Sequence, residues 1–161
     1  MPEGWSDFLV AEVGASAALG GLLFVGLSIN LEQILALPGI PNRAFTALAM
    51  LLTVLVVCSL GLVPHQSGTS IGIETLVIGG ILWIAGTRGD IREYRGRFYY
   101  TMGVFLGDVI LFQIAVLPYL IGSVLILSGY EGGFFFIAAA VVISFVKAVL
   151  DAWVLLVEIK R

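Results

Sequence analysis

Long apolar stretches, separated by short polar segments, follow one another through the whole sequence. A helix needs roughly 20 mostly apolar residues to cross a bilayer, so each stretch is a candidate membrane span. Segments rich in proline and glycine, at 38–41, 64–68 and 129–133, separate several of the stretches. The pattern predicts five transmembrane helices. They cover residues 8–29, 44–63, 71–86, 101–128 and 134–157.

The third stretch, 71–86, is the shortest, and its about 16 residues barely cross the hydrocarbon at roughly 1.5 Å per residue. A re-entrant hairpin there would leave four spans instead of five. The positions of the basic residues favour five, because lysine and arginine concentrate in cytoplasmic loops. With the N-terminus outside and the C-terminus in the cytoplasm, every basic residue beyond the spans falls on the cytoplasmic side. These residues are Arg43, Arg88, Arg92, Arg95, Arg97, Lys160 and Arg161.

The composition strengthens the membrane assignment. Of the 161 residues, 60% are hydrophobic and 12% are charged, whereas soluble domains average about 25% charged residues. Such a chain is not expected to be a soluble enzyme domain, and its net charge of −3 gives no basic field for nucleic acid. We expect a single all-α integral membrane domain over 1–161. The acidic start of the chain and the compact loops suit a bacterial inner membrane.

The sequence offers little material for metal or thiol chemistry. Cys58 and His65 are the single cysteine and histidine of the chain, so it can form neither an internal disulfide nor a zinc cluster of cysteine and histidine. Phosphate-binding loops and nucleophile elbows are absent from the sequence. We expect no cofactor and no enzyme activity, although a membrane-embedded enzyme using carboxylates, lysine or hydroxyls stays open.

The segment between the first two spans predicts a short additional helix. Apolar residues recur at helical spacing in 31–37, with Glu32 and Gln33 opposite, as in an interfacial helix. Asn42 is then expected to cap the second span. Arg43 would lie near the lipid phosphates on the cytoplasmic side.

Small residues recur on several predicted helix faces and allow helices to approach closely in lipid. Such a face can pack within one bundle or can join copies of the chain in a homo-oligomer, and the pattern fits both. On the third span, Gly72, Gly79 and Gly86 recur at spacing seven. The other candidates for helix packing are Gly14, Ala18 and Gly21 on the first span and Gly103 and Gly107 on the fourth.

Ionisable residues inside the predicted spans are the strongest functional signal. Each costs about 2.5–3.5 kcal/mol on insertion scales and therefore needs a partner, water or a role. Lys147 and Asp151 are four residues apart on one helix and can pair. Asp108 and Lys147 lie at similar depths, roughly 13 and 15 Å from the inner edge. We expect a cluster of Asp108, Lys147 and Asp151, with Gln113 extending it toward the membrane centre.

Two interpretations of this cluster remain. It can be a buried charge network that fixes helix register. It can also line a pathway for a proton, an ion or a small polar solute. Two carboxylates for one lysine leave a formal charge of −1, which favours a proton or cation. Glu12 and Glu74, near the outer ends of their spans, could reach the headgroups or line an outer vestibule on such a path.

The segment 88–97 combines four arginines with Asp90 and Glu93. It can determine topology through contacts with lipid phosphates, or it can bind a cytoplasmic partner. The arginines are Arg88, Arg92, Arg95 and Arg97.

The leading functional hypothesis is a subunit of an oligomeric channel or transporter. One small bundle leaves little room for a pore, whereas several subunits can form one by symmetry. Its partners would be the lipid bilayer, further copies of the chain and an ion or small polar solute. The alternative is a non-catalytic membrane scaffold or accessory subunit of a larger complex.

Overall fold

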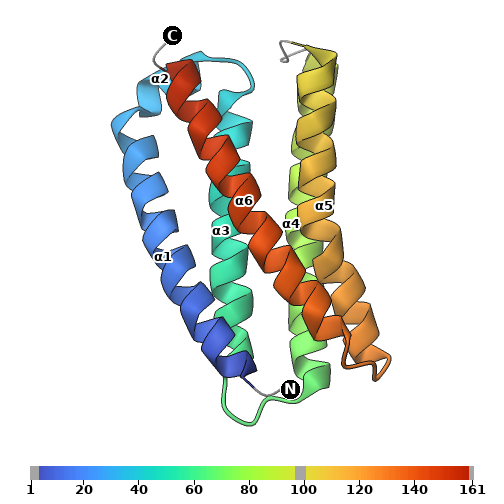
Figure 1. The fold of residues 1–161 in the computed structure, drawn as a ribbon. Coiled ribbons are helices and arrows are strands. Elements are labelled where there is room, and N and C mark those ends of the chain that lie inside the picture. The colour runs from blue at the N-terminus through green and yellow to red at the C-terminus, as the bar shows by residue number, and fades with distance from the viewer. Residues whose placement is uncertain (1–3, 97–100, 160–161) are drawn as a thin grey trace.

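The computed structural model of the chain describes residues 4–96 and 101–159, and these residues form helices and connecting loops without any strand (Figure 1). Five of the helices are long and apolar enough to cross a membrane. The structure therefore confirms an all-α membrane bundle with five spans. The helices are α1 (Trp5–Ile29), α2 (Leu31–Ala36), α3 (Ile40–Gly61), α4 (Gly68–Gly96), α5 (Met102–Leu127) and α6 (Gly133–Ile159).

The third span, α4, differs most from its prediction. It is a continuous helix of 29 residues, so the prediction of a short segment was wrong and a re-entrant hairpin is excluded. The apolar run ends near Gly86, but the helix continues through the arginine segment that was expected to be a loop. Glycine in a helix costs only about 1 kcal/mol, and arginine and glutamate are good helix formers. Arg97 lies outside the described residues.

The long helices alternate in direction, so α1 begins at one end of the bundle and α6 ends at the other (Figure 1). The start of α3 and the last turns of α4 lie at the same end as the C-terminal end of α6 (Figure 1). We call this end the basic end, because it carries Arg43, Arg88, Arg92 and Arg95. The grouping agrees with the charge distribution from which five spans were predicted.

The short helix α2 forms where the sequence predicted it, and its Ile34 is buried against Ile40, Ala44 and Leu155. The helix after it, α3, begins four residues earlier than the predicted span. Gly39 adopts a φ of 83°, which glycine reaches without strain, and the helix starts directly after it. Asn42 therefore lies inside the first turn of α3, and its predicted role as the cap was wrong.

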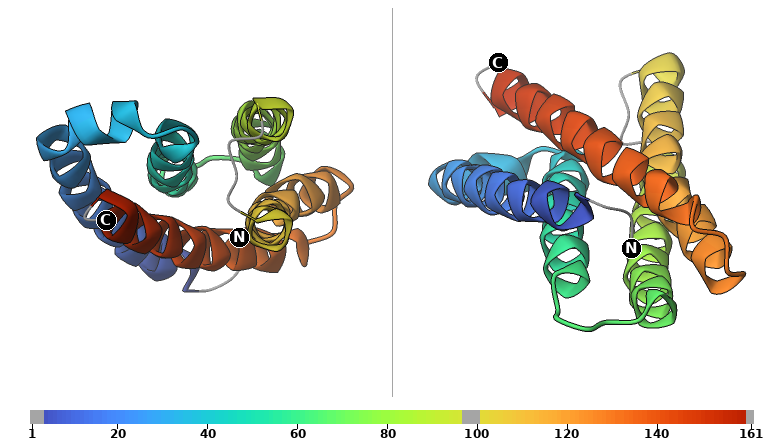
Figure 2. Two further views of the ribbon diagram at one scale, coloured as in Figure 1. Left: turned by 90° about the horizontal axis from the view of Figure 1, so that it is seen from above. Right: turned by 60° about the horizontal axis from the view of Figure 1, so that its bottom comes forward.

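Helix α6 lies diagonally across one side of the bundle, while α3 and α4 lie on the other side (Figure 2). It packs against both α3 and α5. The backbones of α5 and α6 approach closely near the opposite end, where a Cβ added to Gly122 would lie 2.7 Å from the carbonyl oxygen of Gly133. From this crossing the two helices diverge toward the basic end (Figure 1).

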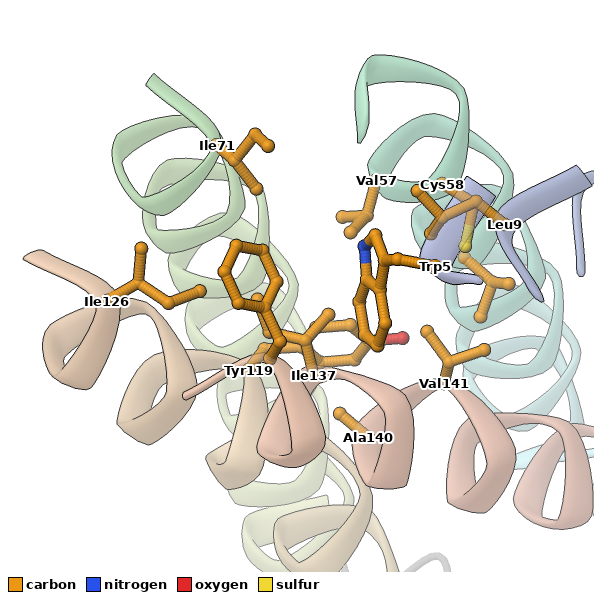
Figure 3. Packing of buried hydrophobic residues seen from close by; sticks show 12 residues of the cluster. Trp5, Leu9, Val57, Cys58, Ile71, Tyr119, Ile126, Ile137, Ala140 and Val141 are labelled. Atoms are coloured by element: carbon orange, nitrogen blue, oxygen red, sulfur yellow. The ribbon is translucent and has the colours of Figure 1, made fainter. Parts of the chain in front are cut away.

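The largest apolar core cluster lies in the half of the bundle away from the basic end. Trp5 of α1, Cys58 of α3, Tyr119 of α5 and Val141 of α6 are all buried there (Figure 3). With Ile71 of α4, which is also in the cluster, all five long helices share this core. The polar residues discussed below lie mainly in the other half.

Candidate functional site

Lys147 of α6 lies between two carboxylates. Its Nζ atom donates to Asp151 Oδ2 at 2.5 Å, one helical turn along α6, and to Asp108 Oδ1 on α5 at 2.9 Å. Lys147 and Asp151 are each 1% exposed, while the Asp108 side chain is 26% exposed. The structure thus brings together the three ionisable residues that were expected to form a cluster.

Arg43 joins this group, a contact that the sequence reasoning did not predict. Its Nη2 atom lies 3.4 Å from Asp108 Oδ1, the same oxygen that accepts from Lys147, and its side chain is 16% exposed. The early start of α3 places Arg43 in the first turn of that helix, within reach of α5. Arg43 and Lys147 together balance the carboxylates of Asp108 and Asp151, so these four residues alone have no formal net charge.

Two acidic residues of α4 lie beside these ion pairs, and the sequence reasoning did not place them there. Glu93 Oε2 accepts a hydrogen bond from Asn42 Nδ2 at 3.4 Å. Asp90 Oδ2 is buried and accepts no hydrogen bond from the residues described, and Asp90 interacts electrostatically with Asp108 and Lys147. The sequence contained a signal for this. Asp90 and Glu93 continue, at spacings of four and three, the buried face of α4 that contains Gly86.

We call these six residues the charge cluster. Four anions and two cations give it a formal charge of −2. Within the described part of the chain, no set of three or more carboxylate, histidine or cysteine side chains could hold a metal ion. The members of the charge cluster are Arg43, Asp90, Glu93, Asp108, Lys147 and Asp151.

Gln113 does not extend the charge cluster as predicted. Its Oε1 atom accepts from Trp83 Nε1 at 2.8 Å, and its Nε2 atom donates to Thr87 Oγ1 at 3.3 Å, so it bonds to α4. Five residues at about 100° each turn Gln113 roughly 140° from the direction of Asp108. Depth along the helix was enough to predict the ion pairs. It did not place Gln113, because it takes no account of the direction in which a residue points around the helix.

Buried hydroxyl groups continue from the charge cluster along α6. Ser144, Lys147 and Asp151 share one face of the helix at spacings of three and four. The Ser144 hydroxyl lies 3.4 Å from the Tyr119 hydroxyl of α5, and both residues are fully buried. Tyr119 belongs to the apolar core cluster of the other half (Figure 3). Polar atoms thus reach from the ion pairs into that core.

The acidic residues predicted near the outer surface do not meet in the described contacts. Glu74 of α4 accepts a hydrogen bond through its Oε2 atom from Nε2 of Gln66, which lies in the loop before α4, at 2.5 Å. The Oε1 atom of Gln66 is buried without a partner among the residues described. Glu12 is partly buried on α1. His65 is exposed in the same loop as Gln66.

The candidate faces for helix packing divide into two groups. Gly72, Gly79 and Gly86 pack against α5, where an added Cβ at Gly79 would lie 3.0 Å from Tyr119 Cβ. The candidate glycines of the first and fourth predicted spans differ from these, because nothing lies within 4 Å of a Cβ added to any of them. Those residues are exposed in the single chain. They are Gly14, Ala18, Gly21, Gly103 and Gly107.

A comparison of the chain with protein families, with curated proteins and with solved structures found no match.

Proposed function

We propose that the chain is a subunit of a channel or transporter that carries protons across a membrane, with the charge cluster as the proton-binding site. The observation that carries the proposal is the pairing of Lys147 and Asp151, which are 1% exposed inside a helix that can span a bilayer. Ionisable residues at such positions are costly and typically mark ion pathways or proton relays.

Protons suit this arrangement better than larger solutes. Asp108 is the more exposed partner of Lys147, so it gives protons a point of access from the basic end. From there, Lys147, Ser144 and the Tyr119 hydroxyl form a row of polar groups into the core. A proton can move along carboxylates and hydroxyls in a closely packed bundle, whereas a solute needs an open passage.

Asp108 is the switch in this proposal. Its Oδ1 atom accepts from Lys147 and also pairs with Arg43. Protonation of Asp108 removes the charge that attracts both cations and leaves Lys147 with Asp151 alone. The neighbouring Asp90 interacts electrostatically with Asp108, and its buried Oδ2 atom has no partner among the described residues, so it would be a further acceptor for the proton. Repeated protonation and release at Asp108 would couple proton movement to the positions of α3, α5 and α6.

We further propose that the working unit is a homo-oligomer in a bacterial inner membrane. The exposed small residues of α1, including Gly14 and Gly21, permit close approach of another helix. The same exposed face favours a second candidate function, a membrane scaffold that binds other helices. Such a scaffold would use α1 and leave the charge cluster as a structural network.

Proton flux into proteoliposomes, followed with a trapped pH-sensitive dye, separates these proposals. Wild-type protein is expected to carry protons above the rate of protein-free liposomes. Asp108→Asn is expected to reduce the flux by about a hundredfold or more, as is typical for the loss of a positioned acid–base group. Glu32→Gln removes an exposed carboxylate of α2 and serves as the matched control, with wild-type flux.

The charge-balanced double variant Lys147→Met/Asp151→Asn sharpens the test, because it removes the buried pair without stranding a charge. A folded double variant without flux supports the proton pathway. Two outcomes would contradict the proposal and favour the scaffold. One is a double variant that carries protons as fast as the wild type. The other is a wild-type protein that shows no flux under pH gradients or with several cations and anions.

A further inference from the structure

A pocket opens at the basic end between the start of α3 and the last turns of α4. Its volume is about 360 Å³, and the α2–α3 connection closes one side. Asn42, Arg92 and Glu93 give it polar walls, while Phe45 gives it an apolar one. Arg92 is exposed and Glu93 partly buried. The pocket therefore presents one positive and one negative group beside an apolar surface.

A second pocket of about 310 Å³ continues from the first along α3 and α4. Phe45 lines both pockets. On α3, Phe45, Ala49, Leu52 and Val56 recur at spacings of three and four, so they form one stripe down the helix. None of these four residues is among the α3 residues buried in the bundle, and Phe45 and Leu52 are 58% and 57% exposed. Because Phe45 lines both pockets, they form one groove along the contact between α3 and α4.

The dimensions of this groove match one leaflet of a membrane. From Phe45 to Val56 the stripe covers 11 steps, or about 16 Å at the rise of a helix. Half of a hydrocarbon core of about 30 Å is about 15 Å. The polar pocket thus lies at the level of the headgroups when the apolar pocket lies in the acyl region.

We propose that this groove binds a phospholipid whose headgroup carries a phosphodiester and a primary ammonium, as in phosphatidylethanolamine. Arg92 would bind the phosphate and Glu93 the ammonium, while one acyl chain would lie along the apolar stripe. The choice rests on charge complementarity. A purely anionic headgroup would leave Glu93 beside negative charge, and a choline headgroup has no N–H with which to donate to it.

Asn42 has a positioning role in the proposed site. Its Nδ2 atom donates to Glu93 Oε2 at 3.4 Å, which holds the carboxylate on the pocket side of α4. Gly89, one turn before Glu93, also lines the pocket. A side chain at Gly89 would meet the Asn42 amide, so glycine at this position leaves room for that hydrogen bond.

Native mass spectrometry of the purified full chain tests the proposal. The protein would be exchanged into mixed micelles containing equal amounts of phosphatidylethanolamine, phosphatidylcholine and phosphatidylglycerol with the same acyl chains. We expect wild-type protein to retain phosphatidylethanolamine in preference to the other two. Equal retention of all three lipids, or preference for phosphatidylglycerol, would overturn the proposal.

Substitutions then assign each part of the site. Glu93→Gln should lower the ratio of bound phosphatidylethanolamine to phosphatidylcholine about tenfold, as expected for one lost charge-assisted hydrogen bond. Arg92→Gln should weaken retention of all three lipids by a similar factor. Ala85→Leu, which fills the apolar pocket, should reduce retention without changing the ratio.

Arg95→Gln is the matched control for loss of a positive charge, since Arg95 is exposed on the same turns of α4 and does not line the pocket. It is expected to retain lipid like the wild type. An equal loss with Arg95→Gln and Arg92→Gln would show nonspecific attraction to headgroups and overturn the proposal. Far-ultraviolet circular dichroism of each variant confirms that the helices are intact.

Discussion

The two halves of the bundle are held together in different ways. Near the opposite end, α5 and α6 touch through Gly122 and Gly133, and the residues around them are apolar. Toward the basic end the same helices diverge (Figure 1), and Lys147 connects α6 to Asp108 of α5. Small residues thus allow α5 and α6 to contact where they converge, and long charged side chains connect the two helices where they separate. The two halves should therefore respond differently to substitution.

Removing one charge from the buried pair should have the largest effect. Lys147→Met leaves Asp151 buried without its cation, and breaking a buried ion pair in this way typically costs about 3–5 kcal/mol. The free energy of unfolding, measured by titration with sodium dodecyl sulfate in mixed micelles, checks this value. The double variant Lys147→Met/Asp151→Asn should recover most of the loss. If the single and double variants are equally unstable, the pair is not the source of the effect.

Adding volume at the helix crossing should cost somewhat less. Gly122→Val places a side chain against the Gly133 carbonyl oxygen and Ile137, and overpacking of this kind costs about 1–3 kcal/mol. Gly103→Val on the same helix is the control, because nothing lies within 4 Å of a Cβ added there. The same unfolding titration applies. Equal losses at the two positions would contradict the close contact between α5 and α6.

The hydrogen bonds of Gln113 that connect α5 to α4 should contribute still less to the free energy of unfolding. Gln113→Leu removes the acceptor of the Trp83 indole N–H and the donor to Thr87. A typical hydrogen bond contributes about 0.5–1.5 kcal/mol. Because Trp83 loses its partner, its fluorescence maximum should also shift. Ile114→Leu, an exposed neighbour, should change neither quantity, and an unshifted spectrum in Gln113→Leu would contradict the hydrogen bond.

Sequence patterns identified the apolar helices and the depths of their charged residues, but not the rotation and contacts of those helices. Hydropathy and helical rise were enough to group Asp108 with Lys147 and Asp151. They could not place Arg43, because its position depends on where α3 begins, and that start is set by Gly39. Asp90 and Glu93 were missed because the end of an apolar run was taken as the end of a helix, although α4 continues to Gly96.

The smallest effect on the single chain is expected at the exposed face of α1. Gly14→Ala adds a methyl group where nothing lies within 4 Å, and alanine is favoured over glycine in a helix by up to about 1 kcal/mol. The monomer should therefore be unchanged or slightly more stable, unlike the Gly122→Val variant.

If copies of the chain pack through this face, the bulkier substitution Gly14→Leu should dissociate them without lowering the stability of the monomer. Sedimentation equilibrium in detergent measures this, with Leu22→Ala, at another exposed position of α1, as the control. An unchanged association state in Gly14→Leu would exclude the Gly14 face as the subunit contact and would leave the exposed glycines of α5 as the next candidate.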